Sequence, residues 1–377
     1  MRVRVLALAS YPVEGASSRF RIVQFIEPLA VRGIDVTFSP FLDASLFAAL
    51  YAPKRLVRRL PRVALRTLGR VADAFRSADV VLVQREAMLF GPPVIEWLAA
   101  RLLRRPLLLD LDDATYIAAA SPVYGRVATL LKWPGKTDRL IRWARTVICG
   151  NPNIADYAQA RGVETAVIPA VVDTRVFFPR TSSSSDVPTI GWIGTHTTFP
   201  FLRRLLPLFE RLGRERRFCV RIIGSGRDDI RFDGRVDGVE IETRAWDIGR
   251  EAEDFRSLDI GVYPLDDDAW NAGKSGLKAV QYMASGVPFV MSPVGVCAAM
   301  GRAGETHLAA VTDDEWLDAL RRLLDDEELR RKMGQAGRAF AERWSSIDGA
   351  ADSLAAIIKA AVPLRRPALR AARERRE

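Results

Sequence analysis

Two lysines stand at the predicted start of a helix in the second half of the chain. Residues 273–278, Gly-Lys-Ser-Gly-Leu-Lys, precede an apolar, helix-like stretch at 279–284. Free N–H groups, the positive end of a helix dipole and two ammonium groups together attract anions. The pattern predicts a diphosphate site formed by Lys274, Ser275, Gly276 and Lys278. The alternative is a solvated basic first turn.

Glycine-rich turns follow two predicted strands of the same half. The strand at 189–194 ends on Gly194, and the strand at 220–223 runs into Gly224-Ser225-Gly226. Glycine allows a backbone to approach a ligand closely, although any tight strand-to-helix turn favours the same residues. We expect ligand contacts from Gly194, Thr195, His196, Gly224 and Ser225.

Three carboxylates end an apolar strand in the first half, at Asp110, Asp112 and Asp113. In an extended chain the first two share one face and Asp113 lies on the other. They could bind a divalent metal, act as a base or hydroxyl acceptor, or cap the next helix. We favour a functional role, because clustered carboxylates repel one another unless something compensates their charge.

The loop after the first strand combines small and basic residues at a predicted helix start. Gly15, Ser18 and Arg19 lie in it, and Arg19 could meet a phosphate across a cleft. A serine cap with exposed arginines is the alternative.

The elements that position these residues alternate between strands and helices. Apolar runs at 3–9, 35–38, 80–84, 106–109 and 146–149 are separated by longer amphipathic stretches, the first of them at 19–32. This alternation is typical of βαβ units with a parallel sheet, and the second half repeats it at 189–194, 220–226, 259–264 and 288–293. Ligands bind outside the carboxyl ends of such strands. A polar run at 181–186 marks a boundary between domains 1–183 and 184–338, followed by a helix at 339–362 and a basic tail at 363–377.

Composition limits the function classes. A chain of 377 residues with a formal charge of +10 is long enough for two or three domains and favours an anionic partner. The three cysteines have neither disulfide nor zinc spacing, which fits a reducing, cytoplasmic location and predicts no metal site. The first ten residues are interpreted as a strand, not a signal peptide.

The segment Lys54–Arg76 carries eight basic residues and one acid. Arginines recur every four residues from Arg58 to Arg70, and an apolar stripe occupies another face. This pattern suits a peripheral helix on the inner, anionic face of a membrane. A surface helix that packs its stripe on the first domain is the alternative. Nucleic acid is not expected as a partner, because aromatic residues do not interleave with the basic ones.

Several of these segments resemble the retaining glycosyltransferases of the GT-B fold, which use nucleotide-activated sugars. Residues 168–179, IPAVVDTRVFFP, are similar to the family's interdomain segment, and 259–265 and 274–290 are similar to its donor-binding core. Ser17–Arg21 and Asp110–Asp113 resemble a bacterial subgroup with diverse acceptors. The resemblance implies an α/β chain of two Rossmann-like, doubly wound domains facing across a cleft, with acceptor on the first and donor on the second.

The family's motif residues are changed at three positions. Its two glutamates, eight residues apart, correspond to Gly273 and Gln281, and a histidine of its first domain corresponds to Asp112. The resemblance implies that Gln281 holds the nucleoside and that Asp112 or Asp113 supports the sugar or orients the acceptor. Lys274 and Lys278 would replace the basic residues that the family carries after the first strand of its second domain.

Together these features predict transfer of a sugar from a nucleotide diphosphate sugar to a hydroxyl with retention of configuration, in synthesis of envelope polysaccharide, glycolipid or glycan. The donor is a co-substrate and no cofactor is expected; the acceptor is unknown. Lys274 would stabilise the leaving diphosphate. The alternatives are a sugar-nucleotide epimerase of the same fold and a non-catalytic scaffold that binds sugar nucleotides.

Overall fold

The strands of the first domain are buried on both faces, as their uninterrupted apolar sequences require. Along β1 (Val3–Ala9), Leu6 and Leu8 enter one core, whereas Val5 and Ala7 enter the other. The computed structural model describes residues 2–50, 58–117, 131, 133, 135–181, 187–224 and 239–363. It shows a parallel sheet in the order β2-β1-β3-β4-β5-β6, completed by β2 (Ile34–Pro40), β3 (Val80–Gln84), β4 (Leu107–Leu111), β5 (Thr146–Cys149) and β6 (Glu164–Val167).

A second parallel sheet, in the order β12-β11-β10-β7-β8-β9, forms the other domain. Its strands are β7 (Thr189–Gly194), β8 (Cys219–Gly224), β9 (Glu240–Ala245), β10 (Ile260–Tyr263), β11 (Phe289–Met291) and β12 (Leu308–Ala309). The strand order reverses between β1 and β3 in the first sheet and between β7 and β10 in the second. Doubly wound sheets bind ligands at such reversals, beyond the carboxyl ends of the strands.

Helices cover both faces of the first sheet. They are α1 (Ala16–Arg21), the 3-10 helix η1 (Val23–Phe25), α2 (Ile26–Val31), α3 (Ala44–Ala49), α5 (Leu60–Ala74), α6 (Val94–Trp97), the π-helix η2 (Leu98–Leu102), α8 (Lys136–Trp143) and α9 (Pro152–Gln159). The amphipathic stretch at 19–32 does not form one continuous helix: α1 ends at Arg21, and a 3-10 turn at Val23–Phe25 separates it from α2. Pro28 explains part of this, because proline cannot donate to the carbonyl four residues before it.

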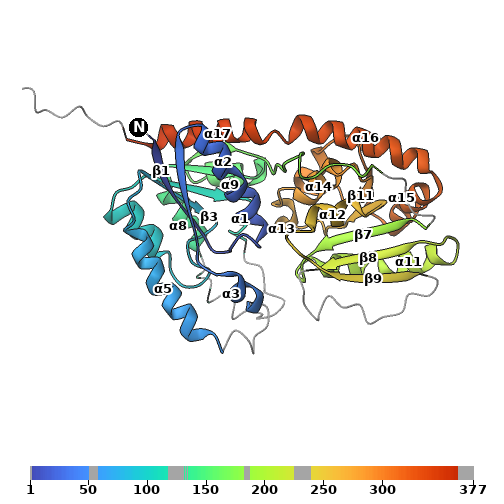
Figure 1. Cartoon of the computed structure of the whole chain (residues 1–377), viewed down its shortest axis with the longest axis horizontal. Helices are drawn as coiled ribbons and strands as arrows, with labels where there is room; N and C mark the ends of the chain where they lie inside the picture. The colour runs from blue at the N-terminus through green and yellow to red at the C-terminus, as the bar shows by residue number, and fades with distance from the viewer. Residues whose placement is uncertain are drawn as a thin grey trace, which may run out of the picture.

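The second sheet is covered by α10 (Phe199–Arg203), α11 (Leu206–Gly213), α12 (Glu251–Arg256), α13 (Ala269–Ala272), α14 (Leu277–Ala284), η4 (Gly295–Ala299), α15 (Asp313–Asp325) and α16 (Glu327–Trp344). The last helix, α17 (Ile347–Ala361), returns to the first domain, so that α16 and α17 span both domains (Figure 1). The structure thus divides the crossing segment predicted at 339–362 into two helices. Ser346 causes the second to start, because its Oγ accepts from the Gly349 amide at 2.9 Å. Among the described residues no helix has both the length and the apolarity to cross a bilayer.

Candidate functional site

The predicted carboxylate cluster lies where β3 and β4 end side by side. Arg85, directly after β3, donates from Nε to Oδ1 of Asp112 at 2.6 Å and from Nη2 to Oδ2 of Asp113 at 2.5 Å. Gln84 Nε2 also donates to Asp112 at 2.9 Å. Arginine therefore supplies the compensating charge that the cluster requires. Among the described residues no group of three or more acids, histidines and cysteines is arranged to hold a metal ion.

Arg85 holds the cluster at an energetic cost. Its φ of 60° is in the left-handed region, which a residue with a side chain rarely adopts outside functional or strained sites. Burial would raise the pKa of Asp112, but the charge and hydrogen bonds of Arg85 outweigh burial and the pKa lies below its ordinary value. Asp112 is therefore an ionised hydrogen-bond acceptor at neutral pH and a poor proton acceptor.

Asp110 forms a separate, structural pair. Its carboxylate receives Arg21 Nη2 at 2.7 Å and Nε at 3.0 Å, and both side chains are only 4% exposed. Arg21 also donates to the Ile168 carbonyl at 2.7 Å, which ties α1 and β4 to the segment that leaves the first domain. Asp110 thus positions the chain around the site and does not reach into it.

The predicted diphosphate site forms the start of α14. Gly276 adopts the left-handed conformation (φ 70°), and neither a side-chain cap nor an acid in the first turn satisfies the helix N-terminus. Lys278 Nζ donates to Gln281 Oε1 at 3.3 Å and lies 5.4 Å from the centre of the Phe255 ring. Burial lowers the pKa of Lys278, and the charge of Glu251 opposes that fall. Two cations and unpaired N–H groups thus meet at one helix end.

Gln281 is completely buried in the described structure. Its Nε2 has no hydrogen-bond partner among the described residues, while its Oε1 receives Lys278. A buried donor without a partner is costly and is unusual in a folded protein. The expectation that Gln281 holds a nucleoside remains a prediction, and the geometry adds that Gln281 orients Lys278.

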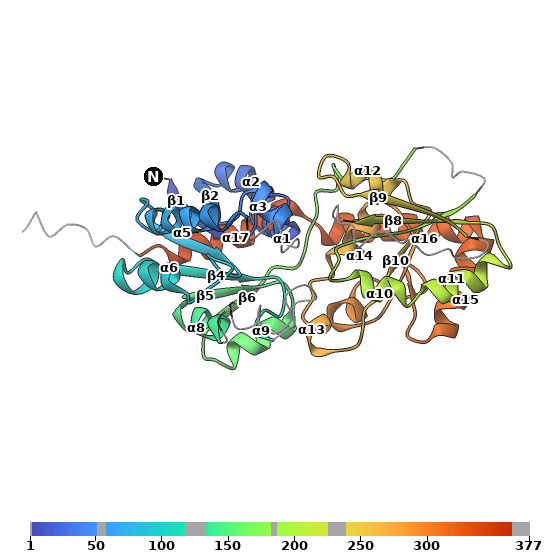
Figure 2. The ribbon, with the colours of Figure 1, turned by 90° about the horizontal axis from the view of Figure 1, so that it is seen from below.

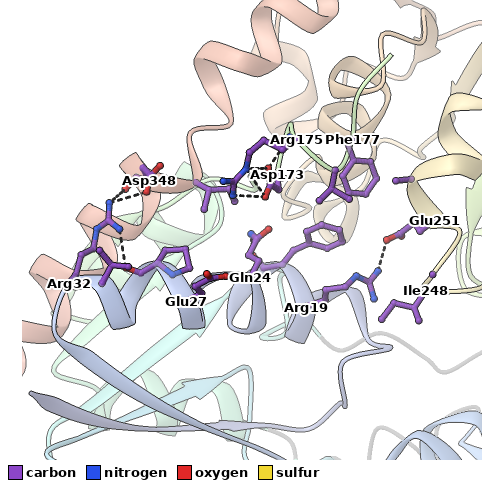
Figure 3. Close-up of a pocket in the computed structure, with 17 residues that line it drawn as sticks. Arg19, Gln24, Glu27, Arg32, Asp173, Arg175, Phe177, Ile248, Glu251 and Asp348 are labelled. Carbon is purple, nitrogen blue, oxygen red and sulfur yellow. Dashed lines mark hydrogen bonds and ion pairs between the residues drawn. The ribbon is translucent and has the colours of Figure 1, made fainter. Parts of the chain in front are cut away.

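Glu251 borders the site, although the sequence analysis did not predict it. Arg19 Nη2 of the first domain pairs with Glu251 Oε2 of the second at 2.8 Å (Figure 3). Trp246 Nε1 also donates to Glu251 Oε1 at 3.3 Å. Arg19 was expected to reach across the cleft, and it does so toward a carboxylate. The pair borders a groove of about 470 Å³ between α1, α2, α12 and residues 173–177. Glu251 begins α12 after a charged strand, and no spacing in the sequence points to it.

The domains also touch beside the predicted diphosphate site. Asn151 Nδ2, after β5, donates to the Gly273 carbonyl at 2.8 Å and to the Lys274 carbonyl at 3.1 Å, so that α9 and α13 lie side by side (Figure 2). A Cβ built on Gly273 would lie 2.4 Å from the Cβ of Ala114. The glycine is therefore required for this approach. Ser275 reaches the same junction, since a Cβ on Gly150 would lie 3.3 Å from its Cβ and 3.1 Å from the Cα of Asp112.

The remaining predicted residues mainly shape loops. Ser18 Oγ donates to the Tyr11 carbonyl at 2.7 Å, and Gly15 leaves no room for a Cβ, which would lie 2.7 Å from that of Tyr11. Gly194 and Gly224 end the paired strands β7 and β8. Thr195 is exposed after β7, His196 is buried, and Ser225 lies outside the described residues.

Two sequence comparisons relate part of this chain to known glycosyltransferases. Residues 187–326 match the family model described as "Glycosyl transferases group 1". The match lies within the second domain, which is therefore similar to group 1 glycosyltransferase domains. A D-inositol 3-phosphate glycosyltransferase from Corynebacterium efficiens is 34% identical over 93 residues, which are 24% of this chain and 21% of that protein. The chain therefore aligns with about a fifth of this relative's length.

Solved structures share the fold of the entire chain. Sucrose-phosphate synthase from Thermosynechococcus elongatus superposes with a TM-score of 0.66 at 16% identity, covering 95% of this chain and 98% of that one. HepE from Anabaena, in complex with UDP and glucose, gives 0.66 at 14% identity, covering 95% and 100%. The α/β architecture is thus the GT-B fold, as expected, and the match to the glycosyltransferase family model lies in its second half.

Proposed function

We propose that the chain transfers a sugar from a nucleotide diphosphate sugar to a hydroxyl acceptor, with retention at the anomeric carbon. The observation that carries this proposal is the uncapped start of α14 with Lys274 and Lys278 beside it, inside a group 1 glycosyltransferase domain. No carboxylate among the described residues forms an ion pair with either lysine. Glu251 acts on Lys278 only through its charge and not through a direct ion pair. A half-buried cation without a directly paired carboxylate gains when an anion binds, and a diphosphate supplies that anion.

The residues then divide the chemistry between the two domains. As the glycosidic bond lengthens, negative charge grows on the diphosphate. The two lysines and the helix N–H groups therefore stabilise the transition state more than they stabilise the bound donor. Asp113 accepts a hydrogen bond from the sugar or from the acceptor hydroxyl, and Arg85 fixes its position. Because Asp112 and Asp113 both pair with arginine, neither is a free nucleophile, and we favour attack from the side of the leaving phosphate.

The structure of HepE with UDP and glucose favours a uridine diphosphate sugar as the first donor to test. We expect the wild-type chain to bind one of the UDP-, GDP-, ADP- or dTDP-sugars in a calorimetric titration, equally well with and without EDTA. Lys274→Ala and Lys278→Ala should each weaken donor binding or turnover by about tenfold or more, because each removes a charge-assisted contact with the diphosphate. Lys332→Ala, at a lysine whose side chain is 68% exposed on α16, is the matched control.

Product analysis separates the remaining alternatives. Retention predicts that the anomeric configuration of the donor sugar is preserved in the product, which nuclear magnetic resonance reports directly. Donor binding without transfer to any acceptor would favour the scaffold, and a changed nucleotide sugar without acceptor would favour an epimerase. Unchanged donor binding and turnover in both lysine variants would refute the diphosphate site.

A further inference from the structure

Helix α5 directs basic side chains toward the first domain and apolar side chains toward solvent, which is the reverse of an ordinary surface helix. Arg70 is 1% exposed, and it donates from Nη2 to the Ala9 carbonyl at 2.9 Å and from Nη1 to the Ser39 carbonyl at 2.8 Å. Arg66 donates from Nε to the Phe41 carbonyl at 2.9 Å. These two arginines cap the ends of β1 and β2. Half of the predicted basic stripe therefore faces the first domain.

The apolar stripe of α5 faces solvent instead. Leu65 is 67% exposed and Leu68 is 69% exposed, and an amphipathic helix normally buries such residues. The alternative reading, in which the stripe packs on the first domain, was therefore wrong. We call the exposed set the outer apolar face; it consists of Leu60, Leu65, Leu68, Val71 and Phe75.

The neighbouring helices extend this character. Helix α5 packs against α6, and α6 and η2 carry three more exposed apolar side chains, Val94, Trp97 and Leu102. Figure 1 places α5 on the flank of the first domain that lies away from the second domain. Monomeric proteins rarely expose apolar side chains in such numbers on adjacent elements unless a partner covers them.

Charge indicates what kind of partner this is. Five arginines between residues 58 and 105 are exposed: Arg58, Arg62, Arg76, Arg101 and Arg104. The acids of the same stretch are all buried or half-buried: Asp73, Asp79, Glu86 and Glu96. We call these five arginines the arginine rim. Arg62 pairs with Asp43 at 3.0 Å and Arg76 with Asp73 at 2.9 Å, whereas the other three form no ion pair among the described residues. A second copy would bring one such rim against another, whereas an anionic surface would neutralise its positive charge. We propose that the outer apolar face and its arginine rim dock on an anionic lipid bilayer.

This arrangement matches a helix that lies in the membrane interface. The apolar side chains enter the boundary between head groups and acyl chains, and the arginines remain at the level of the phosphates. Each arginine near an anionic surface contributes attraction that salt screens. The inference goes beyond the proposed transferase activity and does not rest on it, because it uses none of the residues of the cleft.

Vesicle co-sedimentation tests the proposal with the full chain. Wild type should bind vesicles of phosphatidylcholine with about 30% phosphatidylglycerol at low salt, and should bind pure phosphatidylcholine or high-salt samples far less. Leu65→Gln combined with Leu68→Gln should reduce partitioning by about tenfold or more. Because both side chains are exposed, the thermal midpoint should stay unchanged. Val311→Gln, at a valine 67% exposed in the second domain, is the matched control.

A second variant tests the rim independently. Arg58→Gln combined with Arg62→Gln should weaken binding to the anionic vesicles and reduce its dependence on salt. Absence of wild-type binding to anionic vesicles at low salt would overturn the proposal, and so would equal binding by wild type and the double-leucine variant. If light scattering instead showed a dimer that the double-leucine variant dissociates, the outer apolar face would be an interface between copies.

Discussion

At the scale of residues, the sequence located the acids of the site but not their partners. Asp112 and Asp113 stand out because they follow an apolar strand. Arg85 lies 27 residues before Asp112, and the two meet only because β3 and β4 pair in parallel with Gln84 opposite Asp110. Register of this kind cannot be read from periodicity. A search for charged residues directly after each predicted strand would have found Arg85, since the carboxyl ends of parallel strands share one edge.

The two histidines also show that the surroundings of a side chain cannot be read from the sequence. His307 is a core residue: its ring is 3% exposed and stacks on Phe289 with 5.5 Å between ring centres. Burial lowers the pKa of His307 to about 4. His196 was expected in the cleft and is buried after β7. Sequence position predicts the loop, but burial depends on packing that only the fold supplies.

His307 gives a pH dependence with a definite sign. In the unfolded chain a histidine titrates near pH 6.5, so that below this pH the unfolded state binds a proton that the folded state excludes. Stability is therefore complete above pH 6.5 and falls as the pH drops toward 4. Between pH 7 and pH 5 this group should lower the free energy of unfolding by about 2 kcal/mol.

Urea unfolding at the two pH values measures this loss. His307→Gln, which stays neutral and can still contact Thr306, should lose about 2 kcal/mol less than wild type over the same interval. Equal losses in both proteins would show that other groups control the acid response.

At the scale of elements, apolar strands were predicted more accurately than charged strands and helix breaks. The strands at 3–9, 80–84, 146–149 and 189–194 have the predicted bounds. Strand β9, with the sequence Glu-Ile-Glu-Thr-Arg-Ala, was missed because it lies at the sheet edge and carries no apolar run. The helix breaks at Ile22 and Ser345 depend on tertiary contacts, such as the bond from the Val172 amide to Ser345 Oγ at 3.3 Å.

The junction between the domains predicts the behaviour of Gly273. Gly273→Ala forces residues 271–274 away from Ala114 and from Asn151, and we expect a loss of about 1–3 kcal/mol in the free energy of unfolding. Donor turnover should fall with it, since Lys274 moves with the segment. Urea titration and turnover assays measure the two effects.

A matched pair of variants keeps this test specific. Gly69→Ala on α5 has open space around its Cβ and should stabilise the chain by about 0.5–1 kcal/mol. Adding Ala114→Gly to Gly273→Ala should restore part of the lost stability, because the nearest clashing atom is removed. Failure of this rescue would place the effect of Gly273 elsewhere.

At the scale of the whole molecule, the last helix makes one domain depend on the other. Helix α17 packs against α2 and β4, and its residues join the core that contains β1. Arg32, directly after α2, reinforces this contact through its Nε, which pairs with Asp352 at 2.6 Å. The chain therefore leaves the first domain at 168–179, forms the second domain, and then returns so that α17 completes the core of the first. The ion pair between Arg19 and Glu251 joins the two domains within this frame.

This arrangement predicts that a substitution near the C-terminus opens the N-terminal sheet. Leu354 of α17 is 3% exposed in the core of the first domain, and Leu354→Ala should cost about 2–5 kcal/mol. Hydrogen exchange should quicken at the amides of β1 and β3 more than at those of β7. Leu317→Ala, at an equally buried leucine of α15 in the second domain, should give the opposite pattern. The two substitutions remove the same methyl groups, so the test depends on which amides exchange faster and not on how much faster they exchange. Faster exchange confined to the second sheet in Leu354→Ala would show that α17 does not belong to the first domain.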